Sequence, residues 1–175
     1  MDALRRKLAA GRREAFAELY DTLAERLYRF LVVRLRSRAD ADDVLQETFT
    51  RLARNRGHFE RVENLMAYVF TVARNEAARF AARRSRRRDV ETPLDVDAVF
   101  AIAPDDSRRR ETAEMIAVGL TRLTDQQREV VELKTYGGLT FAEIAEVTNT
   151  PQGTVATRYR TALGRLRSFI REEES

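Results

Sequence analysis

The feature that most constrains this chain is a helix–turn–helix pattern in its last third. Residues 140–147 carry apolar side chains at helical spacing, and Thr148, Asn149, Thr150 and Pro151 then interrupt the pattern. Asn adopts the left-handed turn conformation at modest cost. Thr150 is suited to capping the following helix and Pro151 to its first position. The sequence therefore predicts two helices joined by a tight turn.

The segment 151–171 is predicted to be one amphipathic helix. Its apolar residues recur at i, i+4, i+7, i+11 and i+14, which places them on one face: Val155, Tyr159, Ala162, Leu166 and Phe169. A helix with an apolar back and an Arg/Thr/Gln front suits the major groove of DNA, and an ordinary surface helix is the alternative. The candidate DNA-binding residues are Gln152, Thr154, Thr157, Arg158, Thr161 and Arg165.

Composition favours an all-α protein of one or two small domains. The 175 residues include only 7 Gly and 3 Pro, and no segment alternates polar and apolar residues as a strand does. The absence of cysteine excludes disulfides and fits a reducing cytoplasm. We expect neither a signal peptide nor membrane insertion, because the first residues lead into no apolar segment and none is long enough to span a bilayer.

The chain divides into two helical domains and an acidic linker. The expected boundaries are 1–88, 89–106 and 107–175. The linker holds six acids, no base and two of the three prolines, so we expect it to be extended. Its apolar residues are suited either to binding a partner or to packing against the protein's own domains. We expect helices at 16–35, from 40, from 64 into the arginine-rich run 83–88, and near 108–122, 125–135, 140–147 and 151–171.

The predicted helix from residue 40 has an acidic side opposite an apolar one. An acidic face on a basic protein is repelled by DNA and suits a basic protein surface, although an ordinary solvated face is the alternative. The residues of this acidic side are Asp42, Asp43, Gln46, Glu47 and Thr50.

The predicted helix from residue 64 has the reverse charge, and aromatic residues lie near it. Basic charge beside aromatic rings is typical of a single-strand nucleic-acid site, where cations follow the backbone and rings stack on bases. The alternative is that Tyr68 and Phe80 belong to the core. The candidate binding residues are Tyr68, Arg74, Asn75, Arg79, Arg83, Arg84 and Arg87.

The sequence lacks the combination of reactive side chains that an enzyme's active site requires. There is one histidine, His58, no cysteine, and no glycine-rich phosphate loop. We therefore expect no catalytic residue, no metal site and no cofactor.

Three stretches together resemble the bacterial extracytoplasmic-function (ECF) sigma factors, the small specificity subunits of RNA polymerase. Residues 42–52 are similar to the segment that grips the clamp helices of core polymerase. Residues 67–75 are similar to the segment that handles the melted minus-ten element. Residues 127–131, 143–145 and 153–155 with Arg158 are similar to the domain that reads the minus-thirty-five element. This sequence departs from the family pattern at Arg79, where Asp is frequent, at Asn149, where Gly is usual, and in having no Trp.

The resemblance implies core RNA polymerase and promoter DNA as partners, and an anti-sigma factor as a further partner that the family commonly has. It implies that residues 57–64 and the helix after them capture an unpaired minus-ten base. We expect the protein to be monomeric when free, since it lacks a long heptad seam. The alternatives are a free-standing helix–turn–helix regulator and a sigma-like interaction protein; a hydrolase or transferase comes third.

Overall fold

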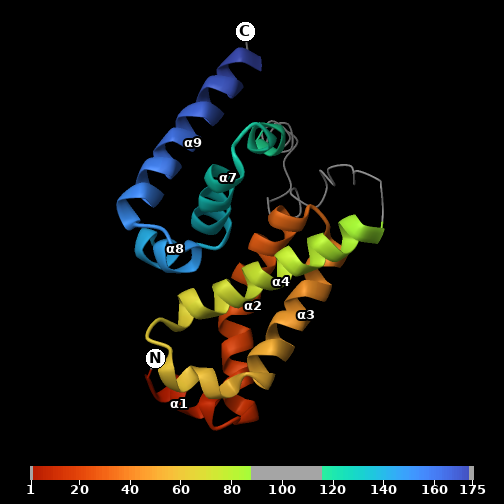
Figure 1. Cartoon of the computed structure of the whole chain (residues 1–175), viewed down its shortest axis with the longest axis vertical. Coiled ribbons are helices and arrows are strands. Elements are labelled where there is room, and N and C mark those ends of the chain that lie inside the picture. The colour runs from red at the N-terminus through yellow and green to blue at the C-terminus, as the bar shows by residue number, and fades with distance from the viewer. Residues whose placement is uncertain (1, 88–115, 174–175) are drawn as a thin grey trace.

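A computed structural model describes residues 2–87 and 116–173 and shows only helical elements in those ranges (Figure 1). The expected boundaries at 88/89 and 106/107, with the linker between them, lie outside the described residues and stay predictions. The N-terminal group contains α1 (Asp2–Ala9), α2 (Arg13–Leu35), α3 (Arg38–Arg54), the 3₁₀ helix η1 (Arg56–Arg61) and α4 (Leu65–Arg87). The C-terminal group contains a helix at 116–121, α7 (Asp125–Val131), the π-helical η2 (Glu132–Tyr136), α8 (Phe141–Thr148) and α9 (Gln152–Glu173).

Local capping sets the limits of the N-terminal helices. Helix α2 ends where Arg36 takes a left-handed conformation with φ of 56°, and its N–H bonds to the Val32 carbonyl. The Ser37 side chain then caps α3 by accepting a hydrogen bond from the Asp40 amide at 3.2 Å. Helix α3 therefore begins at Arg38, and the expectation of a start at Asp40 was late by one half-turn. Asn64 caps α4 by accepting a hydrogen bond from the Ala67 amide at 3.1 Å.

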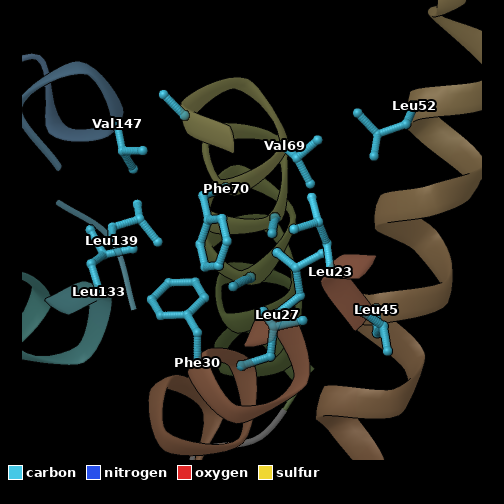
Figure 2. Close-up of a cluster of buried hydrophobic side chains, with 14 of the residues drawn as sticks. Leu23, Leu27, Phe30, Leu45, Leu52, Val69, Phe70, Leu133, Leu139 and Val147 are labelled. Carbon is cyan, nitrogen blue, oxygen red and sulfur yellow. The ribbon is translucent and has the colours of Figure 1, made fainter. Parts of the chain in front are cut away.

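The N-terminal group packs α2, α3 and α4 side by side around one apolar core. Leu27, Leu52 and Val69 are fully buried there, and Leu23 and Leu45 nearly so (Figure 2). Sequence periodicity missed α1 and η1, which are short and pack against each other. Phe59 of η1 is fully buried, and its ring meets those of Phe16 and Tyr68 edge-on. This contact fixes the segment 57–64 against the start of α4.

The C-terminal group begins its helices with two reciprocal caps. Thr124 and Gln127 form a capping box at α7, and Thr140 and Glu143 form another at α8. Gly138, with φ of 65°, turns the chain between η2 and α8. The buried residues of one cluster join α7 and the helix at 116–121 to α9: Leu120, Leu123, Val131, Ala162 and Leu166.

The two groups share a continuous core. The rings of Phe30 in α2 and Phe70 in α4 lie 5.8 Å apart, and both are fully buried. Figure 2 shows these rings facing Leu133, Leu139 and Val147 of the C-terminal group, and all of them belong to one cluster. Contacts of α2 with η2 and of α4 with α8 complete this junction.

Candidate nucleic-acid and protein interfaces

Helices α8 and α9 form the expected helix–turn–helix. Asn149 is left-handed, with φ of 47° and ψ of 49°, and its amide donates back to the end of α8. One expectation was wrong: Thr150 does not cap α9. Its hydroxyl donates to the Thr148 carbonyl at 3.1 Å, and the Pro151 carbonyl accepts the first helical bond, from Val155, at 3.0 Å. The helix thus begins one residue later than predicted, at Gln152, since Pro151 lies at the cap itself.

The front of α9 is polar, and it carries most of the predicted DNA-binding residues. Gln152, Thr154, Thr157, Thr161 and Arg165 are exposed, while Val155 and Ala162 on the back are fully buried. The Arg165 guanidinium donates to the Gln127 side chain at 2.9 Å, which joins the front of α9 to α7.

Arg158 lies at the edge of this front rather than in its centre. It is half-buried and donates to the Thr150 hydroxyl at 3.4 Å. Arg160 is exposed and lies nearer the outward face, yet sequence reasoning did not select it. Arg160 lies three residues after the exposed Thr157, and this helical spacing could have identified it from the sequence.

The acidic side of α3 is open to solvent over about two turns. Asp42, Asp43, Gln46 and Thr50 are exposed, and Glu47 is half-buried beside Arg51 at 3.9 Å. The opposite side of the helix is buried through Val44, Leu45, Thr48 and Leu52. The structure therefore brings all of the predicted acidic side onto one surface.

Some of the predicted nucleic-acid-binding residues of α4 are bound to other residues of the protein, and others have no such partner. Asn75 and Arg83 are exposed with no polar partner among the described residues, and the side chain of Arg87 lies outside them. Arg84 is half-buried and forms an ion pair with Asp40 at the start of α3. The cations of α4 thus do not form one open stripe.

Arg79 forms part of a buried charge network. Glu76 is 1% exposed and accepts from Arg79 at 2.6 Å, and it also forms an ion pair with Arg51 of α3. A buried carboxylate needs such partners. The arginine that departs from the family pattern is therefore held by its ion pair with Glu76.

The aromatic residues of α4 pack against the core, in agreement with the alternative interpretation of Tyr68 and Phe80. Tyr68 is half-buried against Phe59, and its burial raises the pKa of its hydroxyl. Phe80 is also half-buried and packs on the core. Phe70, a third aromatic residue of α4, lies fully inside the junction. Tyr68 is thus the aromatic ring of α4 that retains an open part beside η1.

At the junction, arginines of the N-terminal group bind acidic side chains and backbone carbonyls of the C-terminal group. Arg74 donates two hydrogen bonds to Glu129, at 2.6 and 3.0 Å. Arg34 bonds to Glu132 at 3.1 Å and lies 3.4 Å from Glu129. Arg26 donates to the carbonyls of Gly137 and Gly138, at 2.9 and 2.8 Å. A predicted DNA-binding residue, Arg74, is therefore engaged by the protein itself.

Glu132 is the most perturbed carboxyl group of the junction. Burial raises its pKa to about 7, although Arg34 and Arg128 act in the opposite direction. Glu129, its neighbour on α7, adds to the increase by repulsion. Sequence analysis did not select these acids, since their arginine partners lie far away along the chain.

Within the described ranges, no group of three His, Asp or Glu side chains is arranged to hold a metal ion. No helix in the same ranges is long and apolar enough to span a membrane.

Over residues 2–87 and 116–173, these features define a helical protein of the helix–turn–helix class. Comparison with family models matches Sigma-70 region 2 to residues 19–87 and Sigma-70, region 4 to residues 113–166. The ECF RNA polymerase sigma factor SigK of Mycobacterium ulcerans is 33% identical over 97% of this chain and 93% of its own length. The ECF sigma factor BldN of Streptomyces coelicolor is 33% identical over 86% of this chain and 59% of its own.

Solved structures show the same fold. CnrH in complex with the cytosolic domain of CnrY matches with a TM-score of 0.72 at 20% identity, over 97% of this chain and 96% of that one. RpoE in complex with the anti-sigma factor NepR, from Bartonella quintana, matches with a TM-score of 0.68 at 20% identity, over 89% and 96%. The chain belongs to the ECF RNA polymerase sigma factors. It is a promoter-directing sigma factor, and a free-standing regulator is not favoured.

Proposed function

We propose that this sigma factor uses three separate surfaces to bind its three targets. The front of α9 reads the upstream promoter element, α4 with residues 57–64 captures an unpaired base of the minus-ten element, and the acidic side of α3 docks on core polymerase. The observation that carries this assignment is the separation of charge: an acidic face on α3 and an Arg/Thr/Gln face on α9 are both open to solvent.

The upstream role of α9 follows from its geometry. An exposed polar front on a helix with a buried back can enter the major groove, where Arg and Thr reach base edges and phosphates. Thr154 lies in the first turn, at the end of the helix that such motifs insert. Arg158 reaches a base only by leaving the Thr150 hydroxyl, and the 3.4 Å length of that contact makes the exchange inexpensive.

The minus-ten role of α4 requires the junction to open. Asn75 and Arg83 are exposed without a polar partner among the described residues, and Tyr68 is half-exposed. In contrast, Arg79 is bound to Glu76 and Arg74 to Glu129. Promoter phosphates compete for the same guanidinium that this carboxylate now holds. Opening of the junction upon polymerase binding would release Arg74 for DNA.

The protein acts by binding and carries out no catalysis of its own, and its place is the cytoplasm, where polymerase and promoters are found. The free protein is a monomer of two domains, 1–88 and 107–175, joined by the acidic linker 89–106. The solved structures with anti-sigma factors support a partner of that kind for this chain as well.

The direct test is binding of the purified chain to core RNA polymerase, with duplex promoter DNA alone as a parallel titration. We expect tight binding to polymerase and weak binding to duplex DNA alone, because each DNA surface is small and gains effective concentration from the polymerase complex. Tight DNA binding without polymerase binding would overturn the assignment.

Reversing two charges on the acidic side of α3 tests the polymerase-docking surface. We expect Asp43→Lys with Glu47→Lys to weaken polymerase binding by about tenfold or more, because like charges then face each other across the interface. The thermal midpoint serves as the folding control, since Asp43 is exposed and Glu47 has only a distant partner. Unchanged affinity in the folded variant would remove α3 from the interface.

A further inference from the structure

The whole net charge of the chain resides in two short segments that meet in space. Residues 2–14 and 54–63 contain eight of the 32 Lys and Arg and four of the 28 Asp and Glu. That leaves 24 of each in the rest of the chain, so the net charge of +4 belongs to these segments. Apart from Arg61, which lies in the segment 57–64, the roles proposed above use none of these cations.

The fold brings the two segments together. Helix α1 packs on η1, and the Arg5 side chain bonds to the Val62 carbonyl, just before α4. Gly11, with φ of +72°, comes so close to Arg56 that a Cβ atom there would lie 3.0 Å from its Cδ. Figure 1 shows α1 at the end of the molecule near the start of α4. We call the exposed cations gathered here the α1–η1 basic surface: Arg6, Lys7, Arg12, Arg13, Arg54, Arg56 and Arg61.

The cations of this surface are available to a ligand. Across the described part of the chain, no side chain of these seven residues makes a hydrogen bond or an ion pair. The arginines of α2, α3 and α4 are largely engaged, as Arg34, Arg74 and Arg84 illustrate. The exposed acids Glu14, Glu60 and Glu63 lie nearby but neutralise only part of the charge. Such a surplus of unpaired guanidinium groups attracts a polyanion.

We propose that the α1–η1 basic surface binds the phosphate backbone of the unpaired promoter strand where that strand leaves the minus-ten site. This inference rests on the proposed role of α4 and residues 57–64. Phe59 of η1 contacts Tyr68 of α4, so a strand with a base at Tyr68 lies beside η1 and then α1. The contact is independent of base sequence, because phosphate contacts position a strand and carry no sequence information directly.

The test measures binding of holoenzyme to a promoter fragment whose minus-ten region is single-stranded, over a series of salt concentrations. Each phosphate contact on a single strand contributes about 0.7 to the slope of log affinity against log salt. We expect Arg6→Gln and Arg13→Gln to lower that slope by about 0.7 each, and by about 1.4 when combined. At low salt, the combined variant would bind the fragment several-fold more weakly.

Arg29→Gln is the matched control. It removes one exposed arginine from α2, about 24 Å along the helix from Arg13, and its partner is the exposed Glu25. We expect its salt slope to equal that of the unmodified protein. Affinity for core polymerase without DNA is measured for all variants and is expected to stay constant.

Two results would overturn the inference. An unchanged salt slope in the combined variant would show that the surface is only solvated, and a loss of core polymerase affinity would show that it faces protein instead. Failure of the proposed function has a different signature, because the unmodified holoenzyme would then not prefer the single-stranded minus-ten fragment to a duplex.

Discussion

Phe70→Ala is expected to lower the free energy of unfolding by about 3–5 kcal/mol, the usual cost of removing a buried aromatic ring. Phe70 is fully buried between Phe30 and residues of the C-terminal group, and the Arg26 guanidinium lies 6.0 Å from its ring centre. A Cβ atom on Gly137 would lie 2.9 Å from the ring, so the fit is close on that side as well. The cavity therefore forms at the junction itself, and we expect the two groups of helices to separate.

The separation is measurable because the chain has no cysteine. Cysteines placed at the exposed Ala53 of α3 and Ser168 of α9 would carry a pair of labels, one on each group. We expect Phe70→Ala to lengthen and broaden the distance between the labels. Leu52→Ala is the control: Leu52 is fully buried within the N-terminal group, so it lowers stability by about 2–5 kcal/mol but leaves the label distance unchanged. If Phe70→Ala leaves the distance unchanged too, the remaining apolar and polar contacts hold the junction without the Phe70 ring.

The helix–turn–helix was predictable because its signals are local. The apolar spacing of α9 and the left-handed Asn149 each depend on neighbours within a few residues. The acidic side of α3 was predictable for the same reason, since a single helix displays it. The start of α9 was displaced by one residue because Thr150 and Pro151 both offered starting chemistry, and Pro151 took the cap position.

The junction was not predictable from the sequence, because its contacts join distant residues. Arg74 and Glu129 are 55 positions apart, and Arg34 and Glu132 are 98 apart. Each of these residues appears in sequence as an ordinary charge on a helix, where solvated pairs are the default. In the sequence, Phe70 is one aromatic residue on a helix rich in cations, and only the packing of α4 against α8 and against the buried Leu133 shows that it faces inward. Short α1 was missed because eight residues give too little periodicity.

Glu132→Gln is expected to remove a pH dependence from the stability of the junction. Burial raises the pKa of Glu132 to about 7, so the folded protein binds the proton more tightly than the unfolded chain does. A group of this kind stabilises the folded state fully below its unfolded pKa, and the contribution is lost as pH rises through the folded value. For Glu132 that window runs from the ordinary value of 4.5 to about 7.

Urea unfolding of the two proteins between pH 5 and pH 8 measures this effect. Relative to the unmodified protein, we expect Glu132→Gln to gain about 2–3 kcal/mol of unfolding free energy over that range. The gain arises because the amide never has to carry a buried charge, while its size preserves the packing beside Arg34. Glu63→Gln, at an exposed residue, is the control. Its unfolding free energy is expected to change with pH in the same way as that of the unmodified protein. If the unfolding free energy of Glu132→Gln also changes in this way, the Arg34 ion pair offsets the burial of Glu132 completely, and the junction does not respond to pH through this residue.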